Sequence, residues 1–411
     1  MPPLSASAIA VEDRAAPAAV ATATQAPRAV AAARIRLLLL TDTSIAFSGG
    51  SERFLRNLAT MLPRERYAIT VVQLDAGHHA DAGRHALSGA SHVDLRNLPV
   101  DAVYGPGGWR ALRSLRALLR EGGFDIVQSQ HEKSDLLNAL LPRRPGRLHL
   151  SNRRDMGFKK SARLKQAFRL LNHRFDCVVA PSQPILGELA RSEALEPARM
   201  LWIPNGVDTQ RFRPRQGPAR DAMRQALRLG RETIAFGCVA RFTPEKRHVD
   251  LVDAFARVRA TAPQARLLLV GDGPLRAEVE ARAAALGVAD AVDLLGMRPD
   301  VESVLPALDA GVLASSTEGM SNAILEMMAC GLPVVATAVG GNPSLVRDGA
   351  TGLLAPPLDP AALGDAMSAL AADAALRTRL GAAGRARIEG VFSLAAMVRS
   401  FDQAYQRLLE A

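Results

Sequence analysis

Two glutamates eight residues apart, Glu318 and Glu326, are the residues of this chain whose type and spacing could do chemistry. Residues 309–316 read as a buried strand that runs into a loop, and a short amphipathic helix follows. We therefore expect Glu318 in the loop at the carboxyl end of a strand and Glu326 about two turns into the helix. Ligands bind at that end of the strands in open α/β sheets, and free N–H groups near Ser321 and Asn322 suit an anion. The alternative is a solvated pair on a helix, which is common for glutamates at this spacing.

Arg241 and Lys246 form a second candidate pair, in a segment that follows the carboxyl end of another expected strand. A diphosphate is bound best by cations that converge from two directions, and Arg offers a planar fork while Lys offers a point charge. When a leaving diphosphate gains negative charge, such cations stabilise the transition state more than the ground state. Two basic residues in a loop are also a common surface feature, so this interpretation depends on the neighbouring segments.

A pair of glycines, Gly49 and Gly50, stands between the first expected strand and a helix. Without a Cβ, their backbone N–H groups can approach a phosphate or a sugar closely. Glu52 follows in the first turn of the helix, where a carboxylate interacts favourably with the helix dipole, and we favour that role over ligand binding. Turns that bind nothing use the same glycine pair, so the pattern alone is weak.

Several patterns that would indicate other classes of protein are missing from the sequence. It contains no Asp-x-Asp pair for a metal-bound diphosphate and no Gly-x-x-x-x-Gly-Lys-Ser/Thr phosphate loop. Neither glycine-rich segment, at 105–108 and 271–274, completes the Gly-x-Gly-x-x-Gly fingerprint. His131 and Glu132 begin a His-Glu-x-x-His zinc motif, but position 135 is Asp. A P-loop NTPase, a dinucleotide dehydrogenase and a zinc protease are therefore disfavoured.

Strand-like and helix-like segments alternate along most of the chain, which is typical of parallel α/β layers. With 411 residues, two domains are expected, and the segment 204–230, with its Pro and Arg residues, separates two similar halves. We expect an α/β protein with two Rossmann-like domains, residues 34–210 and 211–390, and a final helix within 391–411. The expected strands are 35–40, 69–74, 125–128, 177–180, 200–203, 234–239, 266–270, 292–295, 310–313 and one from 332. The expected helices are 51–61, 109–120, 161–174, 184–191, 249–260, 275–285, 301–305 and 394–409.

Residues 1–33 are rich in Ala, Pro, Thr and Val and contain no aromatic residue. Glu12 and Asp13 interrupt the apolar core that a signal peptide would need, so we expect a disordered extension. No apolar run approaches the roughly 18 residues of a membrane span. The three cysteines form neither a disulfide framework nor a zinc spacing. These features favour a cytoplasmic protein.

The formal net charge of +10 is concentrated in the first half of the chain. Residues 143–174 hold eleven basic residues and a single acid, Asp155. Such a stretch suggests an anionic partner, which could be a membrane surface, a lipid diphosphate or nucleic acid. The alternative is that the arginines simply solvate a helix.

The segments around these candidate residues resemble one known family, the retaining glycosyltransferases of family four. Residues 318–337, followed by Gly-Gly-Asn-Pro at 340–343, resemble its Glu-x7-Glu region. Residues 237–248 resemble its Arg-x4-Lys diphosphate clamp, and residues 49–52 resemble its Gly-Gly-x-Glu loop. The resemblance implies the GT-B fold, in which two Rossmann-like domains face a cleft and the C-terminal helix returns to the N-terminal domain.

The resemblance also implies a metal-independent enzyme without a cofactor. It would move a sugar from a nucleotide diphosphate sugar to a glycan or lipid-linked acceptor, in cell-surface polysaccharide or glycolipid synthesis. By this resemblance Glu318 holds the sugar hydroxyls, Glu326 holds the ribose hydroxyls, and Arg241 and Lys246 bind the diphosphate. Further donor contacts are implied for Gly49, Gly50, Gly296, Met297, Met320, Ser321 and Asn322.

Three positions depart from the family pattern. A histidine that contacts the transferred sugar is usual at the position of Gln130, whereas here His131 stands one residue later, so either residue could take the role. Arg154 and Asp155 lie where many relatives have a His-Gly-Trp-like segment, and we expect them on the acceptor side. Ser344 replaces a usual glutamate, which removes a carboxylate from a helix start.

Two other classes of function remain open at this point. A sugar-nucleotide epimerase could use the same fold, but it would need further acid and base residues in the cleft. A non-enzymatic binder of an anionic membrane or nucleic acid would depend on the 143–174 stretch alone and would leave Glu318 and Glu326 unexplained. We therefore favour the transferase, with no nucleic acid partner and with the inner membrane face as a candidate surface.

Overall fold

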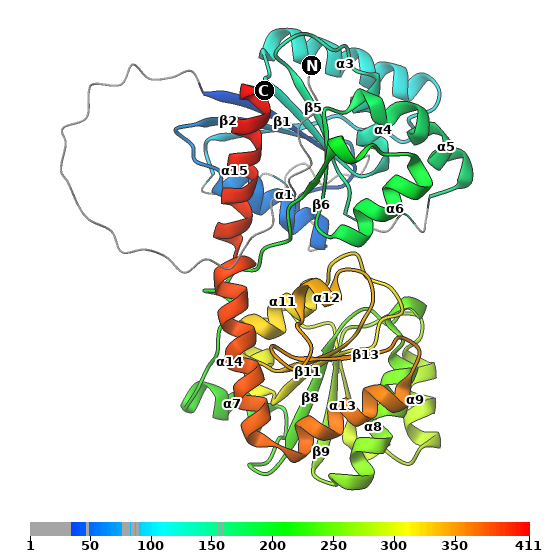
Figure 1. Ribbon diagram of the computed structural model, residues 1–411, viewed down its shortest axis with the longest axis vertical. Helices are drawn as coiled ribbons and strands as arrows, with labels where there is room; N and C mark the ends of the chain where they lie inside the picture. The colour runs from blue at the N-terminus through cyan, green and yellow to red at the C-terminus, as the bar shows by residue number, and fades with distance from the viewer. Residues whose placement is uncertain are drawn as a thin grey trace, which may run out of the picture.

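The computed structural model describes residues 34–46, 49–75, 83, 87, 90–154, 157 and 160–411 (Figure 1). The extension expected at residues 1–33 lies outside these ranges. The described residues form two α/β halves, one above the other in Figure 1, each built on a parallel sheet.

The first half contains a seven-stranded sheet in the order β3-β2-β1-β4-β5-β6-β7, and its paired strands run parallel. The strand order reverses between β1 and β4, and in such sheets ligands bind at the carboxyl ends of the strands beside this reversal. The strands are β1 (Ile35–Thr41), β2 (Tyr67–Gln73), β3 (Val93–Asn97), β4 (Ile126–Gln130), β5 (Leu148–Asn152), β6 (Cys177–Ala180) and β7 (Met200–Trp202). The helices are α1 (Gly50–Met61), α3 (Pro106–Gly122), α4 (Glu132–Leu140), α5 (Ala162–Leu171) and α6 (Gln183–Glu193).

The second half contains a six-stranded sheet in the order β10-β9-β8-β11-β12-β13, and its order reverses between β8 and β11. Arg241 and Lys246 follow β8, and Glu318 and Glu326 follow β11. The strands are β8 (Ile234–Val239), β9 (Ala265–Val270), β10 (Val292–Gly296), β11 (Ala310–Leu313), β12 (Val334–Thr337) and β13 (Leu353–Ala355). The helices are α7 (Pro218–Ala226), α8 (His248–Thr261), α9 (Arg276–Ala285), α10 (Val301–Val304), α11 (Asn322–Ala329), α12 (Asn342–Leu345), α13 (Pro360–Ala372) and α14 (Ala374–Val391).

The central strands of both sheets are buried on both faces, which explains why they read as continuous apolar runs rather than as alternating ones. The four leucines 37–40 of β1 are fully buried. In β9, Leu267, Leu268 and Leu269 are likewise inaccessible to solvent. Each half therefore has its own core, as two domains require.

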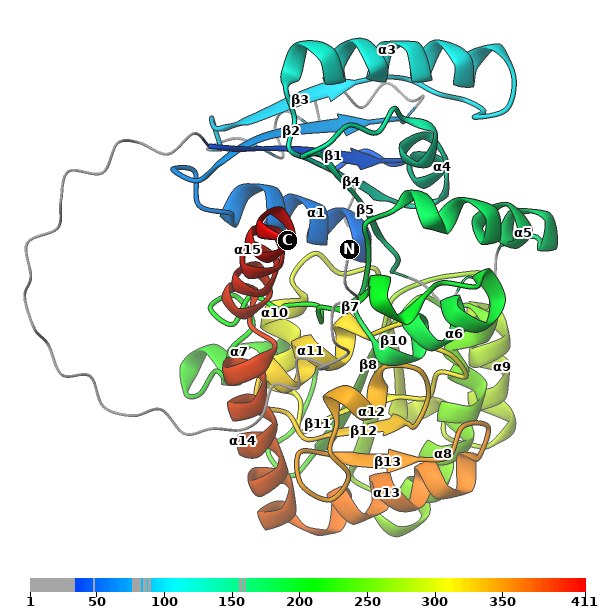
Figure 2. The ribbon, with the colours of Figure 1, turned by 45° about the horizontal axis from the view of Figure 1, so that its top comes forward.

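The final helix, α15 (Leu394–Glu410), lies beside α1 of the first domain (Figure 2). Phe401 of α15 packs on Phe54 of α1, with ring centroids 5.4 Å apart. Tyr405, also in α15, is fully buried and donates a hydrogen bond to Gln128 Oε1 at 2.8 Å. The chain thus returns from the second domain and completes the core of the first.

The two places where the chain passes between the domains lie side by side. Val207 N–H donates to Phe392 O, and Leu394 N–H donates to Val207 O, both at 2.9 Å. Gly206 is required here, because a Cβ at this position would lie 2.8 Å from Leu394 Cα and from Ser393 O. The outward and the returning segments are therefore hydrogen-bonded to each other.

Candidate active site

Glu318 and Lys246 meet at the carboxyl edge of the second sheet. Glu318 stands in the loop after β11 and is 8% exposed, and its Oε1 accepts a hydrogen bond from Ser315 Oγ at 2.8 Å. Lys246 ends a short 3-10 helix after β8, and its Nζ lies 2.6 Å from the same Oε1. The strand reversal thus brings together a carboxylate and an ammonium group that are 72 residues apart in the chain.

Arg241 follows β8 directly and has an exposed side chain. It makes no ion pair with the described residues, in contrast to Lys246. A guanidinium that is exposed beside a buried ion pair can bind an anionic ligand without first breaking a contact of its own.

Glu326 is the fifth residue of α11, so it lies about one turn into the helix and not two as expected. It is 7% exposed, and its Oε1 lies 2.8 Å from Arg53 Nη2 of α1. Burial raises the pKa of the Glu326 carboxyl, whereas Arg53 acts in the opposite direction. The sequence reasoning missed Arg53, because an arginine in the first turns of a helix carries no distinguishing signal.

The first turn of α11 faces the start of α1 across the domain boundary. Ser321 caps α11, and its Oγ accepts the N–H of Ile324 at 3.3 Å. A Cβ on Gly50 would lie 2.6 Å from Asn322 Nδ2, so glycine allows the two helix starts to approach each other. The N-termini of two helices from different domains therefore converge, as an anionic donor requires.

Gly49 and the side chain of Glu52 lie close together at the start of α1. A Cβ on Gly49 would lie 2.2 Å from Glu52 Oε2, so any larger residue here would displace the end of the Glu52 side chain. Glu52 is in the first turn of α1, and its Oε1 accepts a hydrogen bond from Thr43 Oγ1 at 2.7 Å. This placement agrees with the helix-start role that we favour for Glu52.

A second glycine pair supports the backbone of the Glu318 loop. Gly340 has φ +51°, and a Cβ there would lie 1.6 Å from Glu318 O. The N–H of Gly341 donates to Gly319 O at 3.1 Å. Gly341 is the N-cap of α12, and Asn342 is its first residue.

His131 and Gln130 differ in how far they are committed to structural contacts. Gln130 is buried, and its Nε2 donates to Ser51 O of α1 at 2.8 Å. His131 is partly exposed, has φ +89°, and its Nδ1 lies 3.4 Å from Thr41 Oγ1. A positive φ at a residue other than glycine stores backbone strain, and such strain concentrates at functional sites. The geometry therefore favours His131 over Gln130 as the sugar contact.

Asp42 supplies the capping hydrogen bonds of helix α4, because the side chain of the N-cap residue, His131, makes none. The two carboxylate oxygens of Asp42 accept the N–H groups of Lys133 and Ser134, both at 2.7 Å, in the first turn of α4. Burial raises the pKa of Asp42, although these two hydrogen bonds and His131 oppose the change. The start of α4, and His131 with it, is thus fixed by the loop after β1.

The remaining expected donor contacts lie around the same edge. Gly296 ends β10 with φ +67°, and its carbonyl accepts the N–H of Gly271 at 2.9 Å. Met297 follows with 73% of its surface exposed. Met320 is 7% exposed, and its sulfur lies 3.2 Å from the backbone nitrogen of Asn205. Met297 is thus available to a ligand, whereas Met320 contacts the interdomain segment.

Arg154, which we expect on the acceptor side, reaches the domain boundary. Its Nη2 donates to Asn205 Oδ1 at 2.6 Å, and its guanidinium lies 3.8 Å from the ring centroid of Phe54. Asn205 in turn donates to Asn322 Oδ1 of α11 at 3.1 Å. Asp155 lies outside the described residues.

The basic stretch 143–174 is divided between buried and exposed side chains, and Arg143, Arg144, Arg163 and Arg169 are exposed. Arg153 is buried and pairs with Asp135 at 2.8 Å and with Glu193 at 3.0 Å. Lys160 pairs with the other oxygen of Glu193 at 2.6 Å. Arg147 is buried and donates to two backbone carbonyls. The charges of Arg153 and Lys160 are therefore neutralised inside the first domain, which weakens the case for a nucleic acid binder.

Comparisons with known proteins agree with this geometry. A family model described as "Glycosyl transferases group 1" matches residues 233–373, and one described as "Glycosyltransferase Family 4" matches residues 48–211. The chain belongs to the group 1 glycosyltransferases of family four. The two matched segments carry every described candidate residue and all strands of the two sheets except β1.

Two characterised family-four relatives illustrate the similarity. A GDP-mannose-dependent monoacylated alpha-(1-6)-phosphatidylinositol monomannoside mannosyltransferase of Corynebacterium glutamicum is 32% identical over 248 residues. The match covers 58% of this chain and 64% of that protein, which is less than two thirds of its length. A GDP-mannose-dependent alpha-(1-6)-phosphatidylinositol monomannoside mannosyltransferase of Mycobacterium tuberculosis is 29% identical over 364 residues, covering 85% of this chain and 92% of that protein.

A solved structure confirms the fold. The crystal structure of Anabaena HepE in complex with UDP aligns with a TM-score of 0.78 at 22% identity, over 91% of this chain and 100% of that one. The expected GT-B fold of this family-four protein, with two Rossmann-like halves, is thus confirmed.

Proposed function

We propose that this protein is a retaining glycosyltransferase that moves a sugar from a nucleotide diphosphate sugar to a glycan or lipid-linked acceptor. The observation that carries the proposal is the meeting of Lys246 and Glu318 at the reversal between β8 and β11. Beside them, Glu326 and the N-terminus of α11 face α1 of the other domain. The family membership supports the same reaction class.

In this proposal each charged group binds one part of the donor. Arg241 and Lys246 bind the diphosphate, Glu318 accepts hydrogen bonds from the sugar hydroxyls, and Glu326 accepts them from the ribose hydroxyls. The backbone around Gly296 and Met297 reads the nucleobase. Donor binding would exchange the Lys246–Glu318 and Arg53–Glu326 pairs for contacts with the ligand.

The sugar would be transferred on one face of the ring. The bond between the anomeric carbon and the leaving phosphate oxygen breaks, and the acceptor oxygen bonds to the same face of that carbon. The leaving oxygen takes the proton of the acceptor hydroxyl, so atoms and charge balance without a covalent enzyme intermediate. Lys246 and Arg241 stabilise the charge that grows on the diphosphate, so the proposal needs no metal.

The acceptor is expected on the side of the first domain, near His131 and Arg154. The names of the relatives point to glycolipid acceptors and a GDP-mannose donor, whereas HepE was crystallised with UDP. We therefore propose a role in cell-surface glycolipid or polysaccharide synthesis and leave the donor base to experiment.

Helix α3 is our candidate for contact with the inner membrane face. Arg110, Arg113, Arg116 and Arg120 are exposed along one side of it. Trp109 near its start is 70% exposed and Tyr104 just before it is 75% exposed. Cationic side chains flanked by interfacial aromatics suit the headgroup region of an anionic bilayer. The helix lies on the outer side of the first domain, away from the second (Figure 2), and no described helix is long and apolar enough to cross a bilayer.

The decisive experiment is a calorimetric screen against UDP, GDP and ADP sugars, followed by hydrolysis and transfer assays with the best ligand. We expect one nucleotide to bind preferentially and the anomeric configuration to be kept in the product. Chelation by EDTA should leave the rate unchanged. Failure of every nucleotide sugar to bind would overturn the proposal, and an inverted product would overturn the retaining mechanism.

A further inference from the structure

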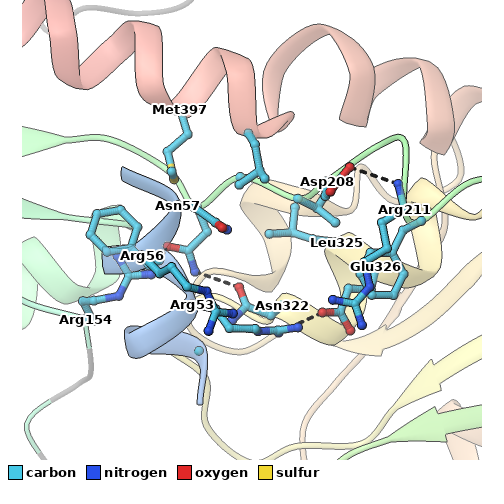
Figure 3. A pocket seen from close by; sticks show the side chains of 17 residues that line it. Arg53, Arg56, Asn57, Arg154, Asp208, Arg211, Asn322, Leu325, Glu326 and Met397 are labelled. Atoms are coloured by element: carbon cyan, nitrogen blue, oxygen red, sulfur yellow. Dashed lines mark hydrogen bonds and ion pairs between the residues drawn. The ribbon is translucent and has the colours of Figure 1, made fainter. Parts of the chain in front are cut away.

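A cavity of about 90 Å³ lies between α1, α11, the interdomain segment 205–212 and the start of α15 (Figure 3). Three segments of the chain contribute arginine side chains to its wall. Asp208 and Glu326 are the carboxylates among its lining residues. The arginines are Arg53, Arg56, Arg154 and Arg211.

Both carboxylates are already engaged. Asp208 Oδ1 accepts the backbone N–H groups of Gln210 and Arg211, at 2.9 and 3.0 Å. Glu326 pairs with Arg53, as described above. Arg211 pairs with Glu302, which lies outside the cavity wall, at 3.1 Å.

Arg56 and Arg154 have no carboxylate partner among the described residues. Arg56 donates to the carbonyl of Ile45 at 3.3 Å, and Arg154 donates to the amide oxygen of Asn205. Burial lowers the pKa of Arg154 to about 9. Burial and the nearby charges of Arg53 and Arg211 also lower the pKa of Arg56. Arg56 and Arg154 are partly buried and form no ion pair with the described residues, although the charge of Glu52 acts on Arg154, so an anion in this cavity would be stabilising.

We propose that this cavity binds a phosphate group, at a site distinct from that of the donor diphosphate. Arginine side chains from α1, from the segment after β5 and from the interdomain segment line one cavity, and guanidinium forks match the several oxygens and the double charge of a phosphate. The volume exceeds the roughly 10–15 Å³ that one water needs, so a small anion with some water can be accommodated. Arg241 and Lys246, which bind the diphosphate in the proposed function, do not line the cavity, whereas Gly50, Asn322 and Glu326 of the proposed donor site do.

A phosphate bound here would contact both domains, because α1 and Arg154 belong to the first and α11 to the second. It would thus favour the arrangement in which the domains face each other as they do here, in proportion to its preference for that arrangement. The phosphate could be a free ion or part of a phosphorylated acceptor, since the same guanidinium contacts serve both.

The test is calorimetric titration of the full chain with inorganic phosphate. We expect Arg56→Gln to weaken phosphate binding by about tenfold or more, because it removes a charge-assisted contact. Arg56→Lys should restore part of the affinity. Lys246→Ala should bind phosphate as the wild type does. No binding by the wild type, unchanged binding by Arg56→Gln, or loss of binding in Lys246→Ala would each overturn the proposal.

A second variant protects the test against misfolding. Arg211 is 46% exposed, so Arg211→Gln should fold normally and also weaken phosphate binding. Nucleotide affinity, measured on the same samples, separates this site from the donor site: it should be unchanged in Arg56→Gln, whatever the donor proves to be. Titration with glycerol 3-phosphate and with dihexanoyl phosphatidic acid identifies the source. Tighter binding of either ester than of the free ion assigns the cavity to a phosphorylated acceptor, and the reverse order assigns it to free phosphate.

Discussion

Arg53 Nη2 and Glu326 Oε1, 2.8 Å apart, form an ion pair that joins the first helix of one domain to helix α11 of the other. The Glu326 side chain is 9% exposed and that of Arg53 is 30% exposed, so water reaches the arginine much more than the carboxylate. In the proposed reaction the ribose hydroxyls take the place of Arg53. Donor binding and the contact between the domains are therefore coupled through one carboxylate.

Replacement of Glu326 should affect donor binding more than chemistry. We expect Glu326→Ala to raise the donor KM more than it lowers kcat, because the ribose is held equally in the ground state and the transition state. Steady-state kinetics with both substrates measure this. The matched control is Glu280→Ala on the exposed side of α9, which should change neither constant. An equal rise in the KM of donor and acceptor would contradict the assignment.

Replacement of Lys246 should have the opposite signature. We expect Lys246→Ala to lower kcat by about 10²–10³, because the lost charge acts on the leaving diphosphate in the transition state. Lys165→Ala serves as the control, since Lys165 lies 3.8 Å from Glu188 in a surface pair. A rise in donor KM with an unchanged kcat would mean that Lys246 binds the donor without stabilising the transition state.

The buried network around Arg153 should contribute to folding and not to catalysis. Removal of Arg153 leaves Asp135 buried without its cation and Glu193 with Lys160 alone, so we expect Arg153→Ala to lower the free energy of unfolding by roughly 3–5 kcal/mol. Denaturant unfolding measures it. The control is Arg191→Ala. Arg191 is 73% exposed and forms a surface ion pair with Glu188, so this variant should change the free energy of unfolding by less than about 1 kcal/mol. If Arg153→Ala and Arg191→Ala lowered the free energy of unfolding equally, the network around Arg153 would contribute no more to folding than a surface ion pair.

His248 should make the protein less stable in acid. It is buried against Phe242, with ring centroids 4.3 Å apart, and burial lowers its pKa to about 4. Since the folded-state pKa lies below the usual value of 6.5, the stabilising contribution is complete above pH 6.5 and is lost as the pH falls towards 4.

We therefore expect His248→Phe to reduce the loss of unfolding free energy between about pH 7.5 and pH 4.5 by roughly 2–3 kcal/mol. Urea unfolding at the two pH values tests this. The exposed His173 provides the control variant His173→Phe. A pH dependence identical to that of the wild type would refute the role of His248. Some dependence should remain, because burial also lowers the pKa of His149 to about 4.

The contact of α3 with anionic membranes can be tested by sedimentation with vesicles. We expect binding to vesicles that contain phosphatidylserine and little binding to pure phosphatidylcholine. Reversal of Arg113 and Arg116 to Glu should reduce binding by more than about tenfold, at about 1 kcal/mol for each lost charge. Reversal of Arg163 and Arg169 on α5 changes the net charge equally. If both double variants lose binding to the same extent, α3 is not the contact surface.

The buried strands could be predicted because they are apolar runs bounded by Gly, Pro or charged residues. Strand β3 was missed, because it lies at the edge of the sheet and alternates apolar residues with Asp94 and Arg96. Strand β5 was missed because it contains His149 and Asn152, which are buried polar residues. Helix α4 was hidden by its buried polar residues, and α13 and α14 by long alanine-rich stretches without a clear apolar stripe.

For the site, local patterns indicated Glu318, Lys246 and the pair Gly49–Gly50, because each lies between a strand and the first residue of the helix that follows it, or at that residue. Arg53 could not be found in this way, since its partner is known only once α1 and α11 are placed against each other. The same reason explains why the burial of some cations of residues 143–174 could not be predicted. The acids that neutralise Arg153 lie 18 residues before it and 40 residues after it, and only the folded chain brings them into contact.

The hydrogen bonds between Val207 and the residues around Ser393 have a mechanical consequence. Both covalent connections between the domains pass through this one point. Relative movement of the two domains is therefore restricted to a rotation about it. Residues near this pivot, such as Asn205, would shift little in such a rotation, whereas residues at the far margin of the cleft would move furthest. A spin label pair across that far margin would therefore report opening with the greatest amplitude, while a pair beside Val207 would record almost none.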